Sequence, residues 1–546
     1  MAIADKIFLG IDVGTGSVRV GAFDRQGRLR GKVDHPIMIW RPRPDFVEQS
    51  SEDIWKATTK ATKRCLKTEG IDPRSVKGIS FDATCSLVAL GEGYNPVTVS
   101  PTKRDSQNII VWMDHRAIQQ ADRINQTGHE VLKYVGGKIS PEMEPPKLMW
   151  LKEHLKESWR RVKVFTDLAD YMVYRSTGND CRSLCTMVCK WTYLGHEGQR
   201  GTYRYDFFEQ IGIADLLDGG KVPQIAYAMG TSAGGLTKAA ALDLGLPEGT
   251  PVGVGMIDAH AGGIGSLGSV LKGSQPGENP FEQSLALIGG TSSCHMAVSR
   301  EPRFVGGVWG PYYSAMIPGM WLNEGGQSAT GSLIDLVIRN NSSRGAIVKA
   351  AQKGKVDIYT FLNQRVERLK RKKGFDLVRN LHVLPYYHGN RSPRADPYAK
   401  GMVSGLTLSD TPDDVAMLYY ATIQAIAYGT RHIIEVMNEK GYGIRKIHLS
   451  GGHLKNRVFI QEHADITGCE ILLPREPEAV LLGAAILAAV AAGEYSDIPQ
   501  AMETMSRTAK VIKPNTSTFS FHEAKYELFK EMYDFQRAMR QTMETL

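Results

Sequence analysis

The stretch Ile7-Phe8-Leu9-Gly10-Ile11-Asp12-Val13-Gly14-Thr15-Gly16-Ser17 decides the fold of this chain. Residues 7–11 are mostly apolar and predict a buried strand, and the alternating residues 18–23 predict a second strand after the turn. A strand–turn–strand hairpin lined with Gly, Thr and Ser exposes backbone N–H groups and hydroxyls that suit a phosphate chain. Glycine also lets a ligand approach the backbone closely. An ordinary tight hairpin is the alternative interpretation of residues 14–17.

A second turn of the same kind, Gly289-Gly290-Thr291-Ser292-Ser293, lies near the middle of the chain. It follows the apolar residues 285–288 and precedes another strand pattern at residues 295–298. Two copies of such a hairpin indicate a duplicated nucleotide-binding fold of the α/β class, with a cleft between its halves.

Two other phosphate-binding motifs are excluded. The dinucleotide fingerprint needs a helix after its glycine-rich turn, whereas a strand pattern follows the first turn here. A Walker A motif needs Ser or Thr after Gly-Lys, but Ile or Val follows every Gly-Lys pair of this chain. The first turn instead has Asp12 at the end of a buried strand, where a carboxylate can hold Mg²⁺ through water.

The length and composition favour a globular protein of two large domains. The chain has 546 residues, of which 42% are hydrophobic and 23% are charged. Single hydrophobic cores rarely grow beyond about 250–300 residues. We place the junction after the strand predicted at residues 251–255, which gives domains of residues 1–268 and 269–546. The polar, glycine-rich residues 272–282 are expected to form a loop there.

The charge is mildly basic, with a net charge of +8 from 66 basic and 58 acidic residues. Much of the excess lies in residues 365–373, which we interpret as a solvated helix face. Nucleic-acid binding is the less favoured alternative, because no aromatic residues are interleaved with this run. The longest apolar stretch, residues 479–492, is too short to span a bilayer and predicts a buried helix. No membrane partner is expected, and the sequence leaves a homodimer open.

Seven scattered cysteines and no recognisable signal peptide predict a cytoplasmic protein with reduced thiols. Cys181, Cys185 and Cys189 recur at helical spacing. We interpret these three residues as a buried stripe. A metal cluster is the less favoured alternative, because no histidine shares their spacing.

Several segments, collinear along nearly the whole chain, resemble the FGGY family of carbohydrate kinases. The turns at residues 10–17 and 289–292 are similar to its two phosphate motifs. Residues 450–452 (SGG) with Asn456 are similar to its adenosine motif. The most specific match is a signature of the second domain, here Pro385-Tyr386, Gly389-Asn390-Arg391-Ser392-Pro393, Asp396-Pro397, Gly401 and Gly405-Leu406.

The resemblance implies an α/β fold of two ribonuclease-H-like domains around a central cleft, as in actin, Hsp70 and hexokinase. It implies that the N-terminal domain carries the sugar and the catalytic base, and that the C-terminal domain carries the nucleotide. It also implies ATP and Mg²⁺ as cofactors, with Asp12 holding the ion through water.

Asp258 corresponds to the catalytic base of such kinases. A sugar hydroxyl is a poor nucleophile, and a carboxylate within hydrogen-bond reach can accept its proton as the oxygen attacks the γ-phosphorus of ATP. From the residues alone, an N-cap of the helix that follows is the alternative for Asp258.

The ATP-binding residues that the resemblance implies come from the two turns, the adenosine motif and their neighbours. They are Gly14, Thr15, Gly16, Ser17, Arg19, Gly290, Thr291, Gln327, Gly451, Gly452 and Asn456.

The sugar is expected at strand ends of the first domain. Residues 81–88 (FDATCSLV) resemble the D-ribulokinase branch of the family, which places Thr84 and Cys85 beside the substrate. Asp114 lies in a W-x-D-x-R segment and is expected to accept hydrogen bonds from sugar hydroxyls, together with Asp258. Arg116 is expected to pair with acidic neighbours and support the loop.

Three further residues are candidates for the sugar site. Lys190 corresponds to a substrate-contacting lysine of ribulokinase-like proteins, with a surface lysine as the alternative. Glu324 resembles part of the ribulokinase E-x-G-Q segment and would reach the sugar across the closed cleft. His260 would either donate a hydrogen bond to the substrate or only fill space in the packed interior. Packing is the favoured interpretation.

These observations predict an ATP-dependent ketopentose kinase that forms a sugar 5-phosphate and closes at a hinge near residue 265. D-ribulose is the first choice of substrate, another pentulose such as L-ribulose or xylulose is second, and a pentitol such as ribitol is third. A nucleotide switch of the actin or Hsp70 type and a silent sugar sensor remain as alternatives. A switch would need an appended partner-binding module, and the chain has only a short helical tail after residue 515.

Overall fold

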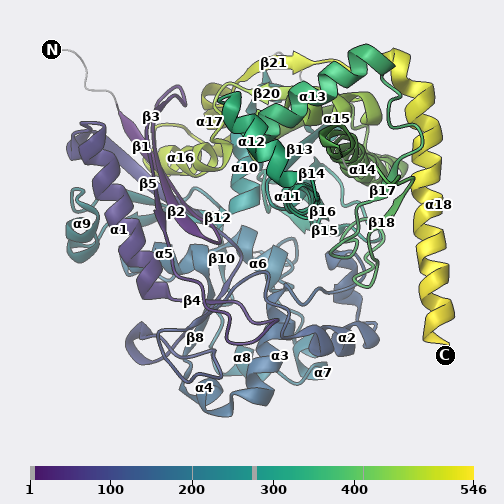
Figure 1. Ribbon diagram of the computed structural model, residues 1–546. Coiled ribbons are helices and arrows are strands. Elements are labelled where there is room, and N and C mark those ends of the chain that lie inside the picture. The colour runs from purple at the N-terminus through teal and green to yellow at the C-terminus, as the bar shows by residue number, and fades with distance from the viewer. Residues whose placement is uncertain (1–5, 200, 273–278, 410, 546) are drawn as a thin grey trace.

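A computed structural model describes residues 6–199, 201–272, 279–409 and 411–545. The loop expected at residues 272–282 falls mostly outside the described residues. Two large sheets form the framework (Figure 1). The first sheet has the strand order β11 (Ser232–Gly235), β12 (Pro251–Ile257), β5 (Val76–Ala83), β1 (Ile7–Val13), β2 (Ser17–Asp24) and β3 (Leu29–Pro36). The second sheet has the order β15 (Trp309–Tyr313), β16 (Trp321–Gln327), β14 (Ser293–Ser299), β13 (Ser284–Gly289), β19 (Lys446–Gly451), β20 (Glu470–Pro474) and β21 (Thr508–Ile512).

The two sheets repeat one topology. In the first, β1, β2 and β3 form an antiparallel meander, while β5 and β12 continue parallel to β1. In the second, β13, β14 and β16 form the meander, while β19 and β20 continue parallel to β13. An antiparallel strand closes each parallel edge, and β15 extends the second meander. The duplicated α/β fold predicted from the two glycine-rich turns is confirmed.

The first half carries a large insertion below its sheet, seen at the bottom of Figure 1. A small sheet of β4 (Glu48–Gln49), β7 (Ile109–Ile110), β6 (Leu87–Leu90) and β8 (Val164–Asp167) lies within it, and β9 (Arg182–Ser183) pairs with β10 (Ala226–Tyr227) nearby. The helices of the first half are α1 (Ser51–Thr68), α2 (Ile118–Gln126), α3 (Glu144–His154), α4 (Lys156–Arg161), α5 (Leu168–Thr177), α6 (Leu184–Lys190), α7 (Tyr205–Gln210), α8 (Asp215–Asp218), α9 (Lys238–Leu244) and α10 (Asp258–Leu267).

Two segments of the insertion differ from what their sequence pattern predicts. Residues 115–135 have the pattern of one helix, but α2 ends at Gln126 and only a 3₁₀ segment, Glu130–Val135, follows. Residues 166–176 have the pattern of another, but α5 begins at Leu168, because Val164–Asp167 pairs with β6 as a strand.

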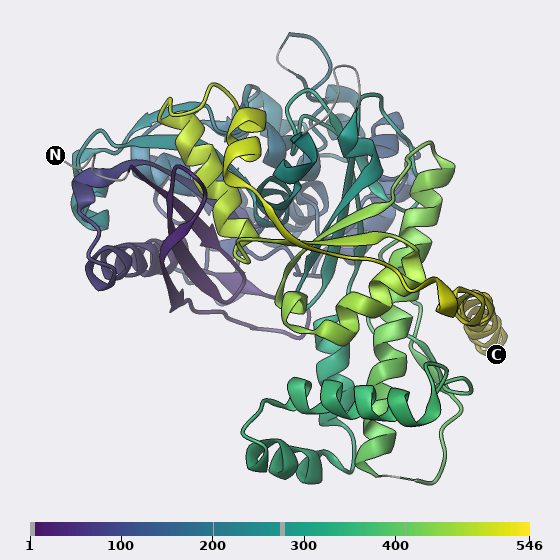
Figure 2. The same cartoon turned by 90° about the horizontal axis from the view of Figure 1, so that it is seen from above.

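Two equivalent helices cross between the halves. α10 follows β12 and packs against β13 and β19 of the second sheet, whereas α16 (Ala479–Ala491) follows β20 and packs against β1, β5 and β12 of the first sheet. Figure 2 shows α16 beside the purple N-terminal strands. A Cβ on Gly483 would lie 2.0 Å from the carbonyl oxygen of Ala261, and one on Gly265 would lie 1.9 Å from that of Ala479. The two helices therefore touch backbone to backbone, which only glycine permits at these positions.

The remaining helices cover the second half. They are α11 (Gly331–Arg339), α12 (Arg344–Lys353), α13 (Ile358–Lys373), α14 (Pro412–Glu439), α15 (Arg457–Thr467), α17 (Ile498–Met505) and α18 (Phe519–Glu544), and a small hairpin joins β17 (His382–Leu384) to β18 (Met402–Ser404). The basic run ends α13, whose buried residues are Leu362, Val366 and Leu369, so the solvated-face interpretation is confirmed. Among the described residues, no helix is long and apolar enough to cross a lipid bilayer.

Candidate active site

Three carboxylates meet at the carboxyl ends of the parallel strands of the first sheet. Asp12 at the end of β1 and Asp82 near the end of β5 are register partners on adjacent strands. Asp258 follows β12, the next parallel strand, and is the first residue of α10. Ligands in open α/β sheets bind at this edge of the sheet.

The environment of Asp258 suits a general base. Burial and the negative charge of Asp12 raise its pKa from 3.8 to about 6, although Arg19 and His260 act in the opposite direction. Its Oδ1 accepts a hydrogen bond of 2.7 Å from the backbone N–H of Ala259. Ile257, not Asp258, is the N-cap of α10, so the capping interpretation of Asp258 is wrong.

Asp82 also belongs to this carboxylate group. Its two carboxylate oxygens are buried and have no hydrogen-bond partner among the described residues. Burial, together with the charges of Asp12 and Asp258, raises its pKa well above the ordinary value. Arg19 forms an ion pair with Asp12 and supplies the nearest positive charge.

The carboxylate group fits a divalent cation. Unpartnered buried carboxylate oxygens cost free energy unless a positive charge balances them. Oxygen ligands of this kind are the donors that Mg²⁺ prefers. Asp12 and Asp82 would hold the ion here, which leaves Asp258 free to act as a base.

The two glycine-rich turns keep an open space above their backbones. A Cβ on Gly16 would meet no atom within 4 Å, and one on Gly290 would meet only the carbonyl oxygen of Ser292, at 3.9 Å. Gly14 and Gly452 have nearest neighbours at 3.5 and 3.9 Å, and none of these four glycines has a positive φ. No contact within the protein explains why glycine stands at these positions. Glycine is expected there if the free space is kept for bound phosphates.

The second turn and the adenosine-like motif lie side by side. Gly289 and Gly451 are register partners on the parallel strands β13 and β19. Gly451 has φ of +86°, and a Cβ there would lie 2.3 Å from the carbonyl oxygen of Gly289. The carbonyl oxygen of Thr291 accepts a hydrogen bond from Thr330 N–H, which ties the turn to the start of α11.

Several residues assigned to ATP have their polar groups engaged within the protein. Asn456 caps α15 through Phe459 N–H and donates to the Tyr419 hydroxyl at 2.7 Å. Gln327, at the end of β16, donates to the carbonyl oxygen of Ile426 and to Thr430 on α14. These contacts give both residues a structural role, and direct contact with the nucleotide stays a prediction.

The first turn is tied to Trp112 and to β4 by two contacts. The hydroxyl of Thr15 accepts a hydrogen bond of 3.0 Å from Trp112, and its carbonyl oxygen accepts one of 2.7 Å from Gln49. The carbonyl oxygen of Ser17 accepts from Gly14 N–H and closes the turn.

Lys190 is buried, so the surface-lysine alternative is wrong. The side chain ends α6, the residue is only 3% exposed, and Nζ lies 4.5 Å from the ring centre of Trp309 on β15. Burial acts to lower its pKa, but Cys85, Glu324 and Glu142 raise it above the ordinary value overall. No hydrogen bond or ion pair to another described residue satisfies this ammonium group, which leaves its donors for a ligand.

Glu324, at the centre of β16, links the two halves. One carboxylate oxygen lies 3.1 Å from Nε2 of His260 on α10, and the other pairs with Arg391. Nδ1 of His260 lies 3.1 Å from Sγ of Cys185. Burial lowers the pKa of His260, but Cys185 and Glu324 outweigh it and raise the value to about 10. The favoured packing interpretation of His260 was incomplete, because the ring also makes two polar contacts.

Asp114 is saturated by its neighbours. Its carboxylate accepts hydrogen bonds from Val47 N–H at 2.6 Å and from Arg116 Nε at 2.8 Å, and it is completely buried. Arg116 also pairs with Glu48 at 2.8 Å. The expectation that Arg116 pairs with acidic neighbours is confirmed. These contacts satisfy the carboxylate of Asp114 without a sugar, so the predicted role of Asp114 as a substrate ligand gains no support.

The loop after β5 supplies the remaining candidates. The hydroxyl of Thr84 lies 3.1 Å from that of Ser86. Burial is the main reason why the pKa of Cys85 rises to about 12, so this thiol stays neutral.

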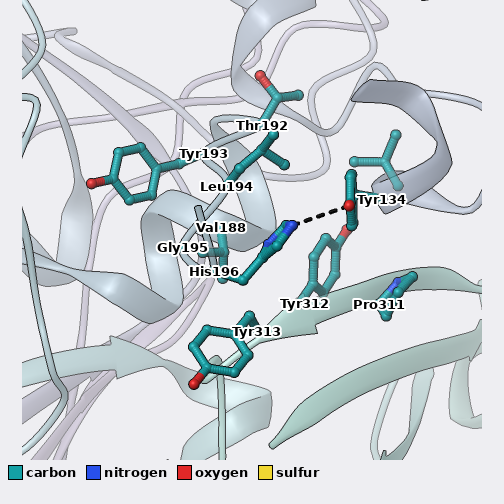
Figure 3. Close-up of a pocket in the computed structure, with 11 residues that line it drawn as sticks. Tyr134, Val188, Thr192, Tyr193, Leu194, Gly195, His196, Pro311, Tyr312 and Tyr313 are labelled. Atoms are coloured by element: carbon teal, nitrogen blue, oxygen red, sulfur yellow. Dashed lines mark hydrogen bonds between the residues drawn. The ribbon is translucent and has the colours of Figure 1, made fainter. Parts of the chain in front are cut away.

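A small pocket is lined by Val188 of α6 and by residues 192–196, which follow this helix (Figure 3). Its wall includes Val188 and Tyr312, and His196 forms a hydrogen bond of 3.0 Å with the Tyr134 hydroxyl across it. It contains no carboxylate and is lined largely by aromatic and apolar side chains, so it suits neither a pentose nor a nucleotide.

Comparison with known proteins agrees with this geometry. The model of the N-terminal domain of the FGGY family of carbohydrate kinases matches residues 7–265, and that of the C-terminal domain matches residues 285–492. The chain belongs to the FGGY family of carbohydrate kinases. An FGGY carbohydrate kinase domain-containing protein of Xenopus laevis is 49% identical to this FGGY kinase over 98% of each chain.

Two further relatives extend the comparison, one by its sequence and one by its solved structure. D-ribulokinase of Saccharomyces cerevisiae is 36% identical to this FGGY kinase over 97% of the chain and 76% of its own length. The structure of Plasmodium falciparum glycerol kinase with ADP has a TM-score of 0.76 at 15% identity, covering 97% of this chain and 98% of that one. The last comparison shows a shared two-domain fold.

Proposed function

We propose that this FGGY kinase transfers the γ-phosphoryl group of ATP to a ketopentose, and that D-ribulose, converted to D-ribulose 5-phosphate, is its substrate. The observation that carries the proposal is Asp258, a carboxylate with a pKa of about 6 at the strand edge where Asp12 and Asp82 meet it. The choice of sugar is supported by the FDATC segment and by the D-ribulokinase of yeast as a relative.

Asp258 would accept the proton of the attacking sugar hydroxyl. A base whose pKa lies slightly below the working pH is charged and still able to take a proton. In-line positioning and charge stabilisation supply the rest of the rate enhancement in phosphoryl transfer. Mg²⁺, held by Asp12 and Asp82, would neutralise charge on the phosphates.

The phosphates of ATP would lie on the two turns. Gly16 and Gly290 leave room for them, and backbone N–H groups are suitable donors. The ADP complex of the glycerol kinase relative supports a nucleotide as the ligand. Residues 269–546 would carry most of the nucleotide site, and residues 1–268 most of the sugar site.

Lys190 and Glu324 would hold the sugar from opposite halves. Lys190 belongs to α6 of the first half, and Glu324 belongs to β16 of the second half. A sugar that contacts both would hold the halves together, with closure about the crossing of α10 and α16 near residue 265.

The test is ADP release from Mg-ATP with D-ribulose, L-ribulose, D-xylulose, ribitol, L-arabinitol and glycerol. We expect kcat/KM for D-ribulose to exceed that for every other compound by at least tenfold, because a buried polar group left unpaired by the wrong epimer weakens binding. A higher value for another compound would contradict the choice of sugar. ATP turnover independent of sugar would instead favour the nucleotide switch, and sugar binding without turnover would favour the sensor.

A further inference from the structure

Two cysteines and a histidine that phosphoryl transfer leaves unused form a buried cluster. Cys185 and Cys189 lie one turn apart on α6, and His260 lies in the first turn of α10. Each residue offers one ligand atom, and these three atoms lie within 4.8 Å of one another. We propose that Cys185, Cys189 and His260 form a binding site for a thiophilic divalent cation of the Zn²⁺ class, separate from the carboxylate group at Asp12.

The distances are close to those of a tetrahedral site. Zn–S bonds of about 2.3 Å and Zn–N bonds of about 2.0–2.1 Å place sulfur and nitrogen roughly 3.5–3.6 Å apart at a tetrahedral angle. Nδ1 of His260 lies 3.1 Å from Sγ of Cys185 and 4.0 Å from Sγ of Cys189. The two separations lie on either side of the required value, and shifts of about half an ångström would equalise them.

Glu324 orients the histidine for this role. Its carboxylate lies 3.1 Å from Nε2 of His260, so the imidazole turns Nδ1 toward the two sulfurs. Metal-ligating histidines commonly donate their other ring N–H to a carboxylate, which fixes the ring and its tautomer. The ion pair between Glu324 and Arg391 holds that carboxylate in place.

The ligand set determines which ions fit. Two thiolates and an imidazole select Zn²⁺ and its close relative Co²⁺, whereas Mg²⁺ prefers oxygen ligands. Three protein ligands leave the fourth tetrahedral position for water. Cys181 continues the cysteine stripe in the sequence, but it precedes α6 and is not part of the cluster, so it supplies a matched control.

Co²⁺ uptake tests the site directly, because tetrahedral thiolate-bound Co²⁺ absorbs visible light. The full-length protein would be dialysed against CoCl₂ for days, since the ligands are at most 1% exposed, and its bound cobalt counted. We expect one Co²⁺ per chain with d–d and sulfur-to-cobalt absorption bands. Cys185→Ser and Cys189→Ser should each weaken uptake at least tenfold, and Cys181→Ser should not change it.

Two results would overturn the proposal. One is a wild-type protein that takes up no Co²⁺ with thiolate bands. The other is equal uptake by folded Cys185→Ser or Cys189→Ser, which would leave the cluster as a thiol–imidazole contact only. Circular dichroism establishes folding, and Cys189→Ser, which keeps the 3.1 Å contact of Cys185, carries the test if Cys185→Ser does not fold. Zn²⁺ should also raise the Tm of the wild type and not that of Cys189→Ser.

Discussion

Asp258 shows how its surroundings set the chemistry of one carboxylate. Burial and the neighbouring charge of Asp12 both disfavour the ionised form, and the hydrogen bond from Ala259 N–H compensates in part. The resulting pKa of about 6 leaves Asp258 ionised at neutral pH, yet basic enough to accept the proton of a sugar hydroxyl.

The pH dependence of the rate follows from this value. Because the base must be unprotonated, kcat/KM for the sugar should be level near neutral pH and fall about tenfold per pH unit below about pH 6, as Asp258 gains a proton. Steady-state rates between pH 5 and pH 8, with ATP and Mg²⁺ saturating, measure the profile. A rate that stays constant down to pH 5 would show that Asp258 is not the group that limits activity.

Asp82 is expected to contribute to cation binding. Asp82→Asn keeps the size of the side chain but removes a charge beside Asp12, so the Mg²⁺ concentration for half-maximal activity should rise at least fivefold. Asp72→Asn is the matched control, because Asp72 is exposed and its carboxylate pairs with Arg74. An unchanged Mg²⁺ requirement in Asp82→Asn would remove Asp82 from the ion's ligands.

At the scale of elements, the strand–turn–strand form of the two glycine-rich segments was what the sequence predicted best. Their signal is local, since strand periodicity and turn glycines occur within a dozen residues. The sequence contains no local signal of this kind for contacts between distant segments. Cys185 and His260 are 75 residues apart in sequence, and the packing of α6 against β12, which leads into α10, brings them together.

Burial was equally hard to predict for charged residues. Lys190 and Asp114 look similar in the sequence, as polar residues near apolar ones. In the structure Asp114 is saturated by Arg116 and Val47, whereas Lys190 has no such partners among the described residues. The difference depends on which side chains meet in the folded chain.

Gly16 tests the role of the first turn. Gly16→Val should leave the fold intact, because a Cβ there meets no protein atom within 4 Å, but it should crowd the phosphates and raise the Kd of ATP at least tenfold. Gly345→Val is the control, since Gly345 is an exposed residue of α12 with equal free space. Calorimetric titration measures the Kd of ATP for both variants. An unchanged Kd for Gly16→Val would place the phosphates elsewhere.

At the scale of the whole molecule, the two halves share their cores. α16 belongs to the second half by sequence but covers the first sheet, and α10 does the converse. The sequence predicted that α16 is buried but not which sheet it covers, because an all-round apolar helix carries no directional pattern.

Gly483→Val should destabilise the whole protein rather than one half. A Cβ at Gly483 would lie 2.0 Å from the carbonyl oxygen of Ala261, and overpacking of this kind costs about 1–3 kcal/mol. Thermal unfolding should remain a single transition at a lower Tm. Gly493→Val is a poor control, because its φ is +70°, so Gly345→Val serves again. Separate transitions for the two halves would contradict the shared core.

The most direct test of the central claim compares sugar binding and turnover in Asp258→Asn. Calorimetry gives the Kd of D-ribulose, and ADP release gives turnover with saturating Mg-ATP. We expect a Kd within threefold of wild type and a turnover lowered by at least about 100-fold, because the sugar keeps its site and loses its base. Turnover near the wild-type rate would contradict the assignment of Asp258 as the catalytic base.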